Sequence, residues 1–157
     1  YEEAEPLYRE AREIYQTIYG LNHLEYIEAV NHLGRFYLDI GKFSLADSLF
    51  QEIDAYWQRQ ENKVHPKYGS FLMNYALLKQ KWGKYDDAEK LALLAISIRK
   101  QFYSATDLAY LRALHYLATI YQKQGKYKEA ENKYQYYSIQ TYNKWNSYLS
   151  IIFHFFD

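Results

Sequence analysis

A repeat with a period of 42 residues runs through this chain and limits its possible folds more than any other feature. A glycine, a lysine and an aromatic residue occur together three times, at Gly41-Lys42-Phe43, Gly83-Lys84-Tyr85 and Gly125-Lys126-Tyr127. Three residues after each aromatic, an alanine precedes an acidic residue. Tyr1 opens a fourth copy, which includes Ala4-Glu5. Such a period predicts a row of similar structural units that stack on their neighbours.

Each unit is predicted to be a pair of antiparallel helices joined at the glycine. Glycine ends a helix well because it adopts a positive φ without a steric clash. Apolar residues at helical spacing lie on both sides of each glycine. One hairpin cannot bury its apolar face alone, so the hairpins are expected to stack into a solenoid. The period places first helices near residues 24–40, 66–82 and 106–124, and second helices near 1–18, 43–60, 85–102 and 127–141.

The residues around the first glycine turn form a longer pattern. It reads Leu33-Gly34-x-x-Tyr37-x-x-x-Gly41-x-Phe43-x-x-Ala46-x-x-x-Phe50, and a close copy starts at Leu117. This pattern resembles that of tetratricopeptide repeats, and the 42-residue period is similar to that of their kinesin-light-chain subclass. The resemblance implies an all-α, right-handed superhelical solenoid of antiparallel helix hairpins. It covers residues 1–142, or about three and a half repeats.

The middle repeat departs from the pattern at two positions. Lys79 stands where a tyrosine is expected, and Ala92 stands where a large aromatic residue is expected. We therefore expect this hairpin to pack less tightly than its neighbours.

Residues 143–157 form a separate C-terminal segment in this interpretation, because the repeat pattern stops and residues 148–156 are strongly apolar and aromatic. The segment is either a capping or truncated-repeat helix that packs on the last hairpin, or an exposed adhesive segment that requires a partner. It is too short to span a membrane. Because Tyr1 begins a second helix without its first helix, we expect the chain to be part of a longer array.

The resemblance also implies where a ligand binds. In such solenoids the first helices line a concave groove that holds an extended peptide or a partner helix. Amide, guanidinium and imidazole groups on these helices suit hydrogen bonding to a peptide backbone or to acidic side chains. The expected groove residues are Asn31, Arg35, Leu38 and Asp39 in the first repeat, Asn74, Leu77, Gln80 and Lys81 in the second, and Arg112, His115, Thr119 and Gln122 in the third.

The composition argues against several other functions. Lysine plus arginine equals aspartate plus glutamate at 19 each, so no net charge attracts nucleic acid or a membrane surface. The chain has no cysteine, and no two of its five histidines have the spacing of a helical zinc site. It also lacks a glycine-rich phosphate-binding loop. We therefore expect no enzymatic activity, no cofactor and no metal.

Three functions remain open at this stage. The first is a cytoplasmic scaffold that binds a protein or peptide partner, with neither nucleic acid nor membrane as a ligand. The second is a regulatory segment of a larger effector, such as a CHAT-type peptidase. The third is a self-assembly module that forms homo-oligomers through its ends or its aromatic tail.

Overall fold

The computed structural model describes the backbone of residues 3–155 and the side chains of residues 3–146. This part of the chain consists of helices joined by short turns and contains no strand, which confirms the predicted all-α class. The helices are α1 (Ala4–Tyr19), α2 (Leu24–Asp39), α3 (Phe43–Gln58), α4 (Pro66–Lys81), α5 (Tyr85–Phe102), α6 (Leu108–Lys123) and α7 (Tyr127–Phe155). We call α2, α4 and α6 the first helices, and α1, α3, α5 and α7 the second helices.

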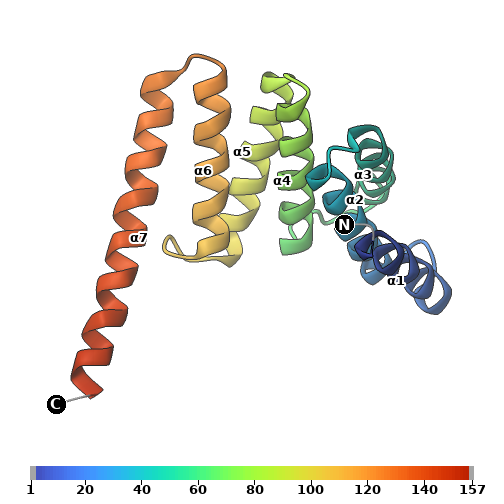
Figure 1. Cartoon of the computed structure of the whole chain (residues 1–157), viewed down its shortest axis with the longest axis horizontal. Helices are drawn as coiled ribbons and strands as arrows, with labels where there is room; N and C mark the ends of the chain where they lie inside the picture. Colours follow the sequence, from blue (N-terminus) through green and yellow to red (C-terminus); the bar gives the residue numbers. More distant parts are fainter. Residues whose placement is uncertain (1–2, 156–157) are drawn as a thin grey trace.

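The helices stack in chain order into a solenoid. Each helix contacts the next one, and in addition α2 contacts α4 and α4 contacts α6. No two second helices approach each other closely along their backbones within the described residues. In Figure 1, α4 to α7 lie side by side, whereas α1 to α3 are seen closer to end-on, so the stack twists along its length. The first helices therefore form a continuous row from which the second helices fan out.

The three glycine turns share one geometry, as the repeat predicts. Gly41, Gly83 and Gly125 have φ values of 77°, 74° and 76°. In each turn the N–H of the next residue, a lysine, donates to the carbonyl five residues earlier, at 2.8 to 2.9 Å. This pattern closes the helix in the manner of a Schellman motif, which requires the left-handed conformation that glycine adopts without strain.

The first helices begin at side-chain caps that also recur every 42 residues. His23 and His65 accept a hydrogen bond at Nδ1 from the backbone N–H two residues later, and Asp107 accepts one at Oδ1 in the same way. Each cap satisfies one of the N–H groups that a helix start leaves unpaired. Two of the five histidines in the sequence therefore have a structural role.

Small residues allow the two helices of each hairpin to approach closely. The residue Gly34 lies against Phe50, and a Cβ added at Gly34 would fall 2.6 Å from Cε1 of that ring. One repeat later the corresponding residues are Ala76 and Ala92, both fully buried. There the backbones of α4 and α5 make more close contacts than those of any other helix pair in the described part of the chain. The expectation that the middle hairpin packs loosely is therefore wrong, because two alanines allow the helices to approach where a larger ring would separate them.

An acidic residue of α1 and one of α5 link these second helices to the following glycine turn. Glu5 accepts hydrogen bonds from the hydroxyl of Tyr37 at 3.0 Å and from Nζ of Lys42 at 2.8 Å. The hydrogen bond from Lys42, followed by one from Arg9, lowers the pKa of Glu5 to about 2. The same contact recurs near the C-terminus, where Lys126 donates to Glu89 at 2.7 Å. These contacts join successive repeats.

The last helix is longer than the repeat pattern predicts. We expected a second helix ending near residue 141 and a new segment from residue 143, but α7 runs without a break from Tyr127 to Phe155. Figure 1 shows it running antiparallel to α6 and extending well past the start of that helix. No glycine or proline follows Gly125, so nothing in the sequence stops the helix. The side chains after residue 146 lie outside the described residues, and the contacts of the aromatic tail stay a prediction.

Candidate functional site

The predicted groove residues lie on the row of first helices, but they are not equally accessible. Leu38 is only 3% exposed and belongs to the same core cluster as Leu78. Its predicted place on an open surface is wrong, because the side chain is packed within the hydrophobic core. Asn31 is also largely buried, at 9% exposure. The other predicted residues, apart from Leu38 and Asn31, define what we call the first-helix face: Arg35, Asp39, Asn74, Leu77, Gln80, Lys81, Arg112, His115, Thr119 and Gln122.

Several of these residues bond to one another across neighbouring first helices. Nη1 of Arg35 donates to Oδ1 of Asn74 at 3.1 Å, and Nδ2 of Asn74 donates to Oδ1 of Asn31, also at 3.1 Å. Further along the row, Nε2 of Gln80 donates to Oγ1 of Thr119 at 3.0 Å. A spacing of about one repeat separates the partners of each bond, so these residues join α2 to α4 and α4 to α6.

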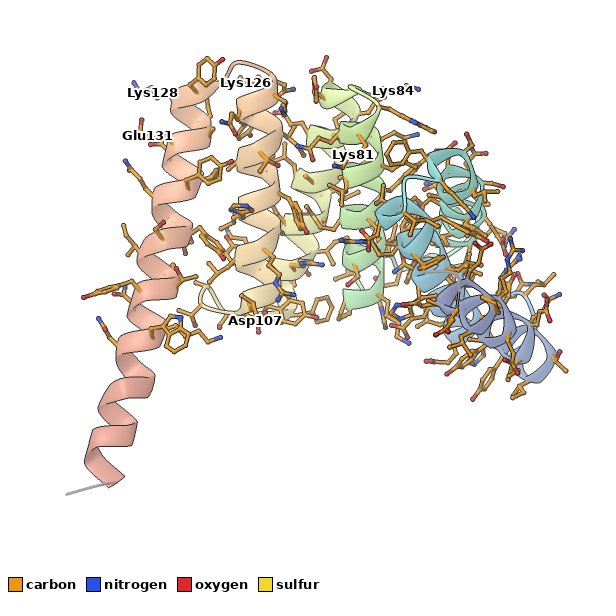
Figure 2. The ribbon with its side chains drawn as sticks, viewed as in Figure 1. Lys81, Lys84, Asp107, Lys126, Lys128 and Glu131 are labelled. Atoms are coloured by element: carbon orange, nitrogen blue, oxygen red, sulfur yellow. The ribbon has the colours of Figure 1, made fainter. Side chains whose placement is uncertain are left out.

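Other residues of the first-helix face remain available to a ligand. Lys81, Arg112 and Gln122 are exposed. Neither Lys81 nor Arg112 makes a hydrogen bond or an ion pair with any described side chain. Figure 2 shows Lys81 near the end of α4, close to the glycine turns. In contrast, Arg35 already pairs with Asp39 at 2.9 Å. The accessible part of the face is therefore positively charged.

His115 lies at the edge of this face, next to the last helix. Its ring centre is 5.4 Å from that of Tyr134 and 5.2 Å from that of Tyr137. Leu77 and Thr119 are half-buried between the more exposed positions. The face thus combines cations, amides and an aromatic edge, which are groups that bind acidic side chains and peptide backbone.

The prediction from sequence missed a second feature on the other side of α6. A cavity of about 480 Å³ lies among α5, α6 and α7, and its walls include Lys100, Tyr110, Lys133 and Tyr136. In the earlier repeats, the positions that correspond to Lys100 and Lys133 carry neutral residues. This difference between repeats could have drawn attention to the two lysines. The cavity itself could not be predicted, because which residues enclose a space depends on helix packing.

The described residues give no indication of a metal centre or a membrane span. They contain no group of three or more histidine, aspartate or glutamate side chains placed to hold a metal ion. None of the described helices is both long enough and apolar enough to cross a membrane.

The stacked hairpins and their continuous row of first helices define a helical-repeat solenoid. The chain belongs to the tetratricopeptide repeat family, whose sequence model matches residues 1–53 and 68–135. Arrays of this family are generally protein-interaction modules and typically non-catalytic scaffolds. No curated protein sequence matches the chain.

Solved structures with a similar fold come from kinesin-light-chain-like proteins. BtubC (BKLC) from P. vanneervenii superimposes with a TM-score of 0.76 at 18% identity, over 91% of this chain and 57% of that one. A putative kinesin light chain from Podosopora anserina with nearly identical TPR-like repeats gives 0.66 at 20% identity, over 91% and 68%. A second crystal structure, of a singly substituted form of the same repeats, gives 0.70 at 19% identity, over 92% and 68%. The predicted kinesin-light-chain-like form of the repeat is thereby confirmed at the level of the fold.

Proposed function

We propose that this chain is a non-catalytic scaffold that binds a peptide or a partner helix along its first-helix face. The observation that carries the proposal is the contrast within that face. Arg35, Asn74 and Gln80 use their hydrogen bonds to join the first helices. Lys81 and Arg112 project from the same row without such partners. A rigid row that presents unpaired cations suits a ligand with acidic side chains.

A variant tests this proposal only if it removes a ligand contact without removing a contact that holds the fold together. Asn74 bonds to both Asn31 and Arg35, so replacing it disturbs the fold as well as the face. Lys81 and Arg112 are exposed, and their replacement leaves the described contacts intact. The informative variant is therefore the double replacement Lys81→Ala with Arg112→Ala.

Binding is measured with a peptide selected on the wild-type chain from a random phage-displayed library. Fluorescence anisotropy then compares its affinity for the wild type and the variants. We expect the double variant to bind about five- to tenfold more weakly, because it loses two charge-assisted contacts. The matched control is Lys90→Ala with Lys128→Ala, which removes the same charge from exposed positions on second helices. Equal losses in the two double variants would show non-specific charge attraction and contradict the proposal, as would unchanged binding by the first.

The cytoplasmic location, the regulatory role beside an effector and the self-assembly through the ends or tail stay predictions. Concentration-dependent association of the chain that disappears on deletion of residues 143–157 would favour self-assembly instead.

A further inference from the structure

The cavity among α5, α6 and α7 lies on a different side of the array from the first-helix face. Tyr110 and Leu114 of α6 line it, whereas Arg112 lies between them in sequence on the opposite side of the helix, since successive positions differ by about 100°. The backbones of α5 and α7 do not approach each other closely, so the space between these two second helices stays open. Its volume of about 480 Å³ is within the range of ligand-binding pockets.

The first gap of the same kind, between α1 and α3, shows how the repeat fills this space with its own side chains. There the buried hydroxyl of Tyr26 donates to Oε1 of Glu52 at 2.6 Å. Nη2 of Arg12 lies 3.1 Å from Oε2 of Glu52 and 3.0 Å from the hydroxyl of Tyr26. A carboxylate between the two second helices thus binds a buried tyrosine of the first helix.

Two repeat periods later, the tyrosine is kept but the carboxylate is missing. Tyr110 corresponds to Tyr26 and is 7% exposed, whereas Tyr136 stands in the place of Glu52. The hydroxyl of Tyr110 has no hydrogen-bond partner among the described side chains. The site therefore has the donor of the first gap without its acceptor.

The first gap has one cation, Arg12, which is paired with Glu52, whereas the cavity has two lysines without such a partner. Lys100 and Lys133 line the cavity, and no acidic residue is among its lining residues. Their counterparts in the first gap are Gln16 and Leu49, which are neutral. Neither lysine forms an ion pair with a described side chain.

We propose that this cavity binds a carboxylate side chain of an acidic polypeptide beside Tyr136, and that this carboxylate supplies the acceptor that Glu52 provides in the first gap. The carboxylate accepts a hydrogen bond from the Tyr110 hydroxyl and pairs with Lys100 and Lys133. It enters between the second helices, so it is independent of a ligand on the first-helix face.

The variant Tyr136→Glu tests the site from within, because it restores the residue type of the first gap. We expect its melting temperature at neutral pH to exceed that of the matched control Tyr136→Gln by about 2–4 °C, the shift that corresponds to the net contribution of one ordinary hydrogen bond in a domain of this size. The difference should disappear when Tyr110→Phe is added to both variants. A Tyr136→Glu chain that is no more stable than the glutamine variant overturns the proposal.

A titration then tests binding in trans. The probe is the blocked peptide acetyl-Gly-Glu-Glu-Gly-amide, added to the isotope-labelled full chain up to millimolar concentration and followed by nuclear magnetic resonance. We expect shifts in the signals of Lys100, Tyr110 and Lys133, and none with the Gln-Gln peptide. Tyr136→Glu should abolish the shifts. Absence of shifts with the glutamate peptide, or equal shifts with the glutamine peptide or with inorganic phosphate, overturns the assignment of a carboxylate site.

Discussion

Nζ of Lys79 lies 3.2 Å from Oδ1 of Asp47, and both side chains are largely buried, at 14% and 15% exposure. In the preceding repeat the corresponding contact is made by Tyr37, whose hydroxyl donates to Glu5. The middle repeat thus keeps the link between a second helix and the last turn of the next first helix, but replaces a hydroxyl donor with a cation. Lys84, the counterpart of Lys42, lies over the ring of Trp82 instead.

Replacing Lys79 with alanine should therefore destabilise the chain. The change leaves the carboxylate of Asp47 largely buried without its cation, and we expect a loss of about 1–3 kcal/mol in the free energy of unfolding. Lys79→Tyr should retain most of the stability, because it restores the residue type of the other repeats. Urea unfolding measures both, with exposed Lys81→Ala as the control. A Lys79→Ala chain as stable as that control would contradict this interpretation.

The contact between Glu5 and Lys42 predicts a pH dependence of stability. The pKa of Glu5 is lowered from 4.5 to about 2 in the folded chain, so the folded state favours the ionised carboxylate. This contribution is fully present above pH 4.5 and is lost as the pH falls from 4.5 toward 2. Thermal unfolding followed by circular dichroism should show that the wild type loses stability more steeply in this window than Glu5→Gln. Parallel curves for the two chains would argue against the link.

The close approach of Gly34 to Phe50 predicts a specific pair of compensating changes. Gly34→Ala alone should destabilise the chain by about 1–3 kcal/mol, because the new Cβ would lie 2.6 Å from the ring. Adding Phe50→Ala recreates the pair that Ala76 and Ala92 form one repeat later. The double variant should then lose less stability than the sum of the two single variants, as measured by a double-mutant cycle in urea.

Gly69 supplies the control for that experiment. A Cβ added there has its nearest contact at 3.5 Å, which is an ordinary van der Waals distance. Gly69→Ala should raise stability by about 0.5–1 kcal/mol through its higher helix propensity. If both glycine variants have the same effect, helix propensity alone explains them and the contact with Phe50 is irrelevant.

The cap at the start of α6 gives a further prediction. Asp107→Ala removes the acceptor for the N–H of Ala109, which lies 2.7 Å from Oδ1, and should reduce the free energy of unfolding by about 1 kcal/mol. Asp107→Asn keeps an acceptor oxygen and should retain most of that stability. Equal losses for the two variants would show that charge rather than capping matters at this position.

The fold could be predicted in detail because the periodic glycines and alanines mark each helix pair directly. The predicted start of α6 near residue 106, for instance, differs by two residues from the observed start at Leu108. The site was less predictable. The period shows which residues share a helix face, but not how deeply packing buries them, and so it misplaced Leu38. The end of α7 was missed because it lies where the repeat no longer applies.

The spaces between successive second helices differ between the two ends of the array. Successive repeats contact each other between neighbouring first helices and between each second helix and the next first helix, but not between second helices, so bending of the array changes mainly the spaces between second helices. At the first space, the side chains of Arg12, Tyr26 and Glu52 bridge the two helices and resist such bending. At the last space, the cavity between α5 and α7 contains no such bridge among the described side chains. We therefore expect the array to bend more easily near α7 than near α1.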